Sequence, residues 1–188
     1  MPAPGDANAV ADAWKILESA DEICSASAVT DAVQRVAEEI TERLAGSRPL
    51  VLSVMGGAVV FTGHLLPRLR FPLDFDYIHV TRYGRGTRGG EISWQVGPKE
   101  SVAGRVVLVV DDILDEGETL AAVRSRLLEG GARAFYAAVF ADKDIGRPKP
   151  IRADFVGVRV PDRYVFGFGM DVHGAWRNLP AIYALPAA

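Results

Sequence analysis

Residues 106–120 read VVLVVDDILDEGETL, and this stretch decides the fold. Its first five residues, Val106–Val110, are apolar, which is typical of a strand buried in a parallel sheet. Two adjacent carboxylates, Asp111 and Asp112, follow directly, and a third, Asp115, comes after two apolar residues. Acids at the carboxyl end of a buried strand can hold hydroxyl groups or a magnesium ion, so we expect a ligand site here.

A short loop and a helix follow these acids. Gly117 and Thr119 open a helical pattern whose apolar residues are Leu120, Val123, Leu127 and Leu128. The N-terminus of a helix offers N–H groups without intrahelical partners and a partial positive charge, and both favour a phosphate group. Strand, acids, loop and helix together predict a site for a phosphorylated ligand. A hydrated strand end, as in receiver domains, is the alternative.

The composition is that of one globular domain. The chain has 188 residues, of which 49% are hydrophobic and 24% charged, enough for a single domain with a full core. A net charge of −3 and a pI near 5.6 disfavour bulk electrostatic binding to nucleic acid. Cys24 is the only cysteine, which excludes an internal disulfide and fits a reducing compartment.

Targeting and membrane signals are absent from the sequence. No apolar run reaches the length of about 18 residues that a membrane-spanning helix needs. The first ten residues, MPAPGDANAV, have neither the basic region nor the apolar core of a signal peptide. We therefore expect a cytoplasmic protein without a membrane partner.

Hydrophobic periodicity predicts alternating strands and helices along the rest of the chain. Helices are expected over 9–19, over 29–44 and after Gly57, and strands over 50–54, 75–81, 91–96, 134–141, 155–158 and 165–168. This alternation predicts an α/β fold with an open, mostly parallel sheet flanked by helices. Ligands bind such sheets at the carboxyl ends of the strands, where Met55-Gly56-Gly57, 111–119 and Asp142-Lys143 are expected to lie.

A glycine- and arginine-rich segment, YGRGTRGG, occupies residues 83–90. It has no apolar side chain after Tyr83 to anchor it, so a solvated loop is one interpretation. Its glycines also suit a lid that closes over a site. On that interpretation we expect the segment to be weakly ordered without ligand.

The 106–120 stretch resembles the 5-phosphoribosyl-1-pyrophosphate (PRPP) motif of type I phosphoribosyltransferases. From about Glu22 to Leu185, the order of elements resembles the hypoxanthine-guanine phosphoribosyltransferase branch of that family. The segment ADFVGVRVPDRYVFGFGMD, residues 153–171, is similar to the purine-binding hood of that branch. The resemblance implies a single domain over 1–188, with a core over about 28–145 and a small hood from about 1–27 and 146–188.

The resemblance implies a role for each matching residue. Asp111 and Asp112 would hold the ribose hydroxyls, and Asp115 would be the catalytic base that takes a proton near the purine N7. The loop around the 5′-phosphate would comprise Glu116, Gly117, Glu118 and Thr119. The pyrophosphate loop would comprise Met55, Gly56 and Gly57, with a cis peptide between Val54 and Met55.

The purine site and the metal site are implied in the same way. Lys143 would recognise the 6-oxo group, Tyr164 would stack on the base, and Val165 would contact the purine edge through its backbone. Asp171 and Arg177 would lie on the pyrophosphate side, and the metal would contact Asp111, Asp112 and Asp171. Arg82 and Tyr83 would begin the mobile lid.

Three positions depart from the family pattern. Met55 stands where a lysine is common, which leaves the loop backbone as the pyrophosphate contact. The phosphate loop often reads Asp-Thr-Gly-x-Thr, whereas here Glu116 and Glu118 flank Gly117, and their side chains are expected to point outward. Arg82 replaces the serine that often precedes the lid tyrosine.

The resemblance implies that the chain would transfer ribose 5-phosphate from PRPP to hypoxanthine or guanine with Mg²⁺ as cofactor, and would form a homodimer or homotetramer. A xanthine-preferring transferase and a nucleotide-sensing, RNA-binding regulator on the same fold stay open as alternatives. Individual residues also have simpler interpretations. Asp115 could cap a helix, Lys143 could be a solvated lysine and Tyr164 could be a core residue.

Overall fold

The computed structural model describes residues 4–82 and 92–186. Tyr83 and the segment expected to form a lid lie outside the described residues. The backbone of Arg82 ends a strand. No helix within the described ranges is long and apolar enough to cross a membrane.

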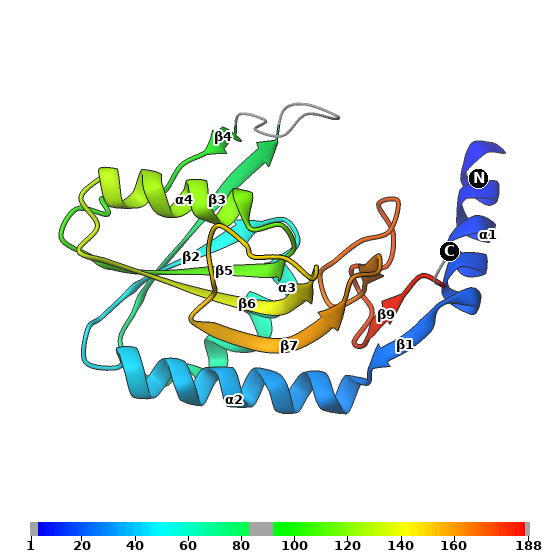
Figure 1. The fold of residues 1–188 in the computed structure, drawn as a ribbon, viewed down its shortest axis with the longest axis horizontal. Helices are drawn as coiled ribbons and strands as arrows, with labels where there is room; N and C mark the ends of the chain where they lie inside the picture. The colour runs from blue at the N-terminus through cyan, green and yellow to red at the C-terminus, as the bar shows by residue number, and fades with distance from the viewer. Residues whose placement is uncertain (1–3, 83–91, 187–188) are drawn as a thin grey trace.

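A six-stranded sheet forms the centre of the molecule, in the order β4-β3-β2-β5-β6-β7 (Figure 1). Neighbouring strands run parallel except β4, which is antiparallel to β3. The strands are β2 (Leu50–Met55), β3 (Asp74–Arg82), β4 (Ile92–Val96), β5 (Val106–Leu114), β6 (Ala134–Asp144) and β7 (Phe155–Pro161). The expected α/β fold with an open, mostly parallel sheet is therefore confirmed.

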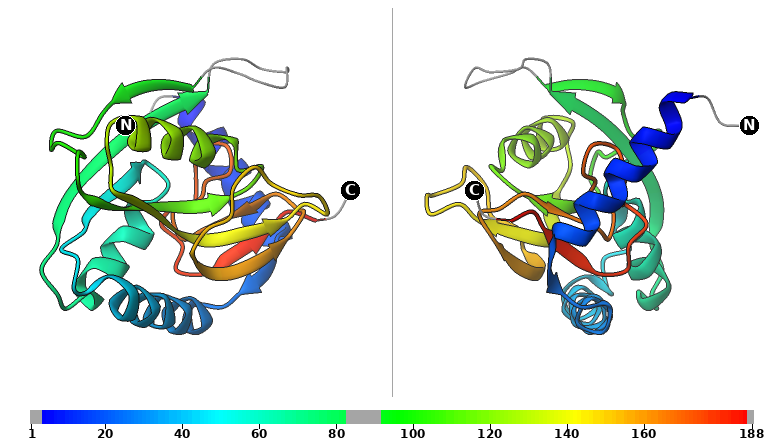
Figure 2. Two further views of the ribbon diagram at one scale, coloured as in Figure 1. Left: turned by 60° about the vertical axis from the view of Figure 1, so that its left-hand side comes forward. Right: turned by 90° about the vertical axis from the view of Figure 1, so that its right-hand side faces the viewer.

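Helices cover both faces of this sheet (Figure 2). Helices α2 (Ala26–Leu44) and α3 (Val59–Leu65), with the short 3-10 turn Leu66–Arg68, lie on one face, and α4 (Glu118–Glu129) lies on the other. Successive side chains of a strand point to opposite faces, so Val106, Leu108 and Val110 pack with α2 and α3. Val107 and Val109 pack in the second cluster, with α4. This burial on both faces explains why the first five residues of β5, Val106–Val110, are apolar without interruption.

A small three-stranded sheet lies beyond the carboxyl ends of β5 and β6 (Figure 1). It joins β1 (Asp21–Cys24), β9 (Ile182–Ala184) and β8 (Val165–Phe166) in antiparallel order. Helix α1 (Pro4–Ser19) precedes β1. The six-stranded sheet includes β7, so it continues beyond residue 145, where the core was expected to end.

Two local expectations were wrong. Strand β5 does not end at Val110 but continues through both acids to Leu114, because Asp111 pairs with Val139 of β6 and the ladder continues beyond it. Helix α4 begins at Glu118, and its N-cap is Gly117 with a left-handed φ of 84°. Asp115 therefore does not cap this helix.

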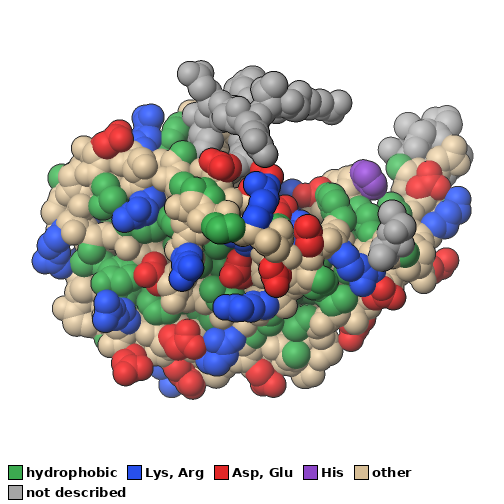
Figure 3. Space-filling model, in the orientation of Figure 1, with side chains coloured by type: hydrophobic (Ala, Val, Ile, Leu, Met, Phe, Trp, Pro, Cys, Tyr) green, Lys and Arg blue, Asp and Glu red, His purple; other side chains and the backbone are tan. Residues whose placement is uncertain are grey.

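The surface carries charges of both signs. On the face shown in Figure 3, lysine and arginine side chains intermingle with aspartate and glutamate, and neither sign forms a large patch of its own. Among the described residues of this face, lysine and arginine therefore form no broad basic surface of the kind that binds phosphate groups of nucleic acid.

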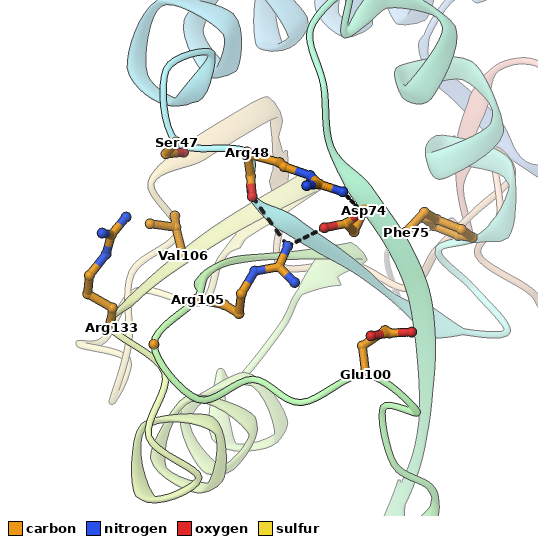
Figure 4. Close-up of a pocket in the computed structure, with 9 residues that line it drawn as sticks. Ser47, Arg48, Asp74, Phe75, Glu100, Arg105, Val106 and Arg133 are labelled. Carbon is orange, nitrogen blue, oxygen red and sulfur yellow. Dashed lines mark hydrogen bonds and ion pairs between the residues drawn. The ribbon is translucent and has the colours of Figure 1, made fainter.

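A cavity of about 690 Å³ lies at the amino ends of the strands, whereas the acids Asp111 and Asp112 lie toward the carboxyl end of β5. Figure 4 shows the Arg105 side chain between Asp74 and the backbone of Arg48, and it donates hydrogen bonds to the Asp74 carboxylate and to the Arg48 carbonyl. Arg48 also pairs with Asp74, at 3.1 Å. The hydrogen bond from Arg105, reinforced by Arg48, holds the pKa of Asp74 below its usual value. These contacts tie together the starts of β2, β3 and β5.

Candidate active site

A cavity of about 440 Å³ opens at the carboxyl ends of β2 and β5. It gathers residues from these strands, from the loop after β5 and from the C-terminal segment. The cavity is lined by Val54, Met55, Gly57, Val80, Asp111, Asp112, Ile113, Leu114, Asp115, Glu116, Gly117, Thr119, Leu120, Asp171 and Arg177. Most residues expected to bind PRPP therefore face one cavity.

Among the expected site residues whose side chains the structure describes, five do not line this cavity. They are Gly56, Glu118, Lys143, Tyr164 and Val165. Lys143 and Tyr164 nevertheless lie beside this cavity, because each forms a hydrogen bond with a residue that lines it. The Lys143 ammonium donates to Asp115 Oδ2 at 2.8 Å, and the Tyr164 hydroxyl donates to the Asp171 carbonyl at 3.2 Å.

Exposure excludes two of the simpler interpretations. The Lys143 side chain is only 11% exposed, so it is not a solvated surface lysine. Tyr164 is 50% exposed, so it is not a core residue, and its ring is available to a ligand. Val165 is buried in β8 next to it.

The two acids at the end of β5 affect each other strongly. Burial raises the pKa of Asp111 well above its ordinary value, and the negative charge of Asp112 raises it further. Burial also raises the pKa of Asp112, although hydrogen bonds from its neighbours and the charge of Arg177 act in the opposite direction. A carboxylate pair in this state is stabilised by any cation that approaches it.

The donor set suits a magnesium ion that arrives with its substrate. Within residues 4–82 and 92–186, no group of three or more histidine, cysteine or acidic side chains could hold a metal on its own. Magnesium is typically bound by one or two carboxylates together with substrate phosphates and water. Asp111 and Asp112 provide hard oxygen donors at one cavity, so these residues fit the ion.

The loop after β2 approaches Asp112 very closely. A Cβ atom added to Gly57 would lie 1.7 Å from Asp112 Oδ2, so only glycine leaves room for this carboxylate. The peptide between Met55 and Gly56 is cis. The cis bond expected between Val54 and Met55 is therefore one residue further along the chain.

The C-terminal segment closes the cavity from the other side. Gly169 has a φ of 104°, and a Cβ atom there would lie 2.1 Å from the Gly57 carbonyl oxygen. Arg177 donates to the Gly169 carbonyl at 2.7 Å and pairs with Asp171 at 2.5 Å. Asp171 also accepts a hydrogen bond from the Gly174 N–H at 2.8 Å, so it stabilises a turn as well as facing the cavity.

Two residues near the site carried no functional signal in the sequence. The Arg147 guanidinium pairs with the Glu116 carboxylate at 2.9 Å, and the Lys149 ammonium donates to the Leu114 carbonyl at 2.7 Å. Both come from the Pro-rich connection between β6 and β7. Their partners are defined only by the tertiary structure, so neither motif nor spacing could have identified them.

The fold and the site define a class of protein. Residues 19–173 match the family model for the phosphoribosyl transferase domain, and the chain belongs to that family.

Within the family, several of its relatives are hypoxanthine-guanine phosphoribosyltransferases. The hypoxanthine-guanine phosphoribosyltransferase of Bacillus subtilis is 34% identical over 94% of this chain and 96% of its own length. A solved hypoxanthine-guanine phosphoribosyltransferase from Bacillus anthracis has a TM-score of 0.83 at 27% identity and covers 88% of this chain and 98% of its own. The RNA-binding regulator considered as an alternative has no support among these relatives.

One relative is a longer protein. The bifunctional protein TilS/HprT of Listeria monocytogenes is 36% identical over 91% of this chain. This chain spans 26% of its length.

Asp111→Asn is expected to raise the midpoint of thermal unfolding near neutral pH. Folding raises the pKa of Asp111, so the folded protein loses stability as the pH rises above the unfolded pKa of about 3.9. A neutral amide does not titrate and avoids this loss. The gain should shrink on acidification and vanish below about pH 3, where Asp111 is protonated in both the folded and the unfolded chain.

Scanning calorimetry across this pH range would measure the effect. Asp31→Asn, which changes an exposed carboxyl group on α2, is the matched control and should show no such gain. If Asp111→Asn melted below the wild-type protein at neutral pH, the raised pKa of Asp111 would be contradicted.

Proposed function

We propose that this chain transfers ribose 5-phosphate from PRPP to hypoxanthine or guanine, releasing pyrophosphate and forming IMP or GMP. The observation that carries the proposal is the pairing of Lys143 with Asp115 beside the cavity that holds the other acids. The pair presents a hydrogen-bond donor next to an acceptor. A 6-oxopurine with a proton on N7 presents the complement, an acceptor at O6 next to a donor at N7.

This complementarity also explains base selection. A lysine ammonium has donors only, so Lys143 can bind the 6-oxo group and opposes the 6-amino donor of adenine. Asp115 is then placed to accept the N7 proton as N9 attacks the sugar. Tyr164 would stack on the base, and the backbone of Val165 would contact the purine edge.

The remaining residues would hold PRPP and the leaving group. Asp111 and Asp112 would bind the ribose hydroxyls, while the N-terminus of α4 with Gly117 and Thr119 would bind the 5′-phosphate. Asp111 and Asp112 would also hold a magnesium ion, which would neutralise the pyrophosphate charge. Because Met55 has no charge, backbone N–H groups of residues 55–57 would bind the pyrophosphate, opposite Arg177. The pairing of Glu116 with Arg147 supports this arrangement, because it compensates the carboxylate charge beside the phosphate.

The test is release of pyrophosphate from PRPP and magnesium with hypoxanthine, guanine, xanthine and adenine in parallel. Release with hypoxanthine or guanine, and none with adenine, would support the proposal. Release with xanthine alone would favour the xanthine-preferring alternative. No purine-dependent release would refute a transferase of this class. By family resemblance, the enzyme would be a homodimer or homotetramer in the cytoplasm, and analytical ultracentrifugation would determine the oligomeric state.

Lys143→Ala should weaken the use of 6-oxopurines far more than the binding of PRPP. The loss of a charge-assisted hydrogen bond costs about 1.5–3 kcal/mol, which corresponds to roughly 10- to 100-fold in kcat/KM for the purine. Steady-state kinetics with each substrate varied in turn would measure it. Lys15→Ala is the control, because Lys15 pairs with Asp12 at 3.0 Å on exposed α1. Equal weakening of PRPP and purine would show that Lys143 is not a purine-recognition residue.

A further inference from the structure

Lys149 is a buried lysine that the proposed reaction does not use directly. It lies in the connection between β6 and β7, and its side chain is 9% exposed. Burying an ammonium group is costly unless its three N–H donors all find acceptors. Here the Lys149 ammonium donates to Leu114 O at 2.7 Å, Asp142 Oδ1 at 2.7 Å and Lys143 O at 2.5 Å.

These acceptors belong to the ends of two neighbouring strands. Leu114 is the last residue of β5 and immediately precedes Asp115, the proposed base. Lys143 lies near the end of β6 and is the proposed purine-recognition residue. A single ammonium group therefore connects the backbone on either side of the Lys143–Asp115 pair.

The connection between β6 and β7 also lies beside the phosphate loop, residues 116–119. A Cβ atom on Gly117 would lie 3.4 Å from the Lys149 Cβ and equally close to side-chain atoms of Pro150 and Ile151. Arg147 pairs with Glu116 one position earlier. Arg147, Lys149, Pro150 and Ile151 thus lie beside the phosphate loop. The Lys149 ammonium also donates to two acceptors in β6.

We propose that Lys149 is a positioning residue, which fixes Lys143 and Asp115 relative to each other and to the phosphate loop. The proposal rests on the proposed function, because it gives these two residues their roles. Lys149 does not line the cavity beside Asp111 and Asp112, so it acts through its neighbours. A misplacement of about 1 Å in a reacting group can cost about 100-fold in rate, so a clamp at this point affects catalysis.

The test compares Lys149→Met with Arg152→Met. Methionine nearly keeps the length of the side chain and removes all three donors. Arg152 is an exposed cation of the same connection, and together with Lys149 it lines a cavity of about 470 Å³ beside the ends of β5 and β6. Lys149→Met should lower kcat/KM for the purine by roughly 10- to 100-fold and should also raise the KM for PRPP. Arg152→Met should match the wild-type protein in both.

A double-mutant cycle separates positioning from simple destabilisation. If Lys149 acts through Lys143, the effect of Lys149→Met on purine kcat/KM should be much smaller in the Lys143→Ala background. An equal effect of Lys149→Met on purine kcat/KM in the wild-type and Lys143→Ala backgrounds would overturn the proposal. So would unchanged KM values with only a smaller fraction of active protein. Lys149→Gln keeps an amide donor for Asp142, so it provides the same comparison if the methionine variant does not fold.

The wild-type protein is assayed first with PRPP and each purine. Absence of purine-dependent pyrophosphate release there would refute the proposed function itself. If the wild type is active, and Lys149→Met and Lys149→Gln both have the kinetics of Arg152→Met, only the role of Lys149 is refuted.

Discussion

Asp115→Asn is expected to slow transfer to the purine by about 10²–10⁴-fold, the usual loss when a general base is removed. Asparagine has nearly the same shape as aspartate, but it cannot take the N7 proton. Asp115 lies in a loop after β5 and its side chain is 50% exposed, so the fold should be retained. PRPP affinity should change little, because this role concerns the purine.

Single-turnover measurements with saturating PRPP and hypoxanthine would isolate the chemical step. Asp12→Asn is the matched control, because it also replaces a carboxylate paired with a lysine, at 3.0 Å on α1. Its rate should equal that of the wild-type protein. An Asp115→Asn rate within about threefold of wild type, far from the loss of a general base, would remove Asp115 from that role.

Gly57→Ala is expected to lower kcat/KM for PRPP by about 100-fold or more, the scale of a misplaced site residue. The added Cβ would lie 1.7 Å from Asp112 Oδ2, so either the loop or the carboxylate must move. The loop is the proposed pyrophosphate contact, and Asp112 is a proposed ribose ligand. Either movement disturbs the binding of PRPP rather than that of the purine.

Gly63→Ala is the matched control for this substitution. Gly63 lies in the helix that follows the same loop, and a Cβ atom there meets nothing within 4 Å. Circular dichroism should show both variants folded, and only Gly57→Ala should be impaired. Unchanged PRPP kinetics in a folded Gly57→Ala protein would separate the loop from PRPP binding.

The sequence predicts the central sheet well because burial on both faces leaves a clear pattern. Val106–Val110 is apolar throughout, and the acids and the helix start that follow it locate the site. Two strands of the small sheet, β1 and β9, were not predicted. These strands are only four and three residues long, too short for a periodic pattern, and they form because distant segments pair.

Contacts that depend on tertiary structure were also beyond prediction. Lys149 stands among prolines and a glycine, where a lysine is normally solvated. Two of its three acceptors are backbone carbonyl oxygens, which no residue type reveals. The continuation of β5 to Leu114 likewise depends on pairing with β6, not on the polarity of Asp111 and Asp112.

Asp111, toward the carboxyl ends of the strands, should gain a proton at a higher pH than Asp74, at their amino ends. At the carboxyl edge, Asp111 has a raised pKa and is among the first of the shifted acids to gain a proton. At the amino edge, Asp74 has a lowered pKa and keeps its pairs with Arg105 and Arg48 until the solution is more acidic. Mild acidification would therefore protonate Asp111 while these ion pairs remain. Ligand binding that depends on the Asp111 carboxylate should therefore weaken at a higher pH than the one that breaks these ion pairs.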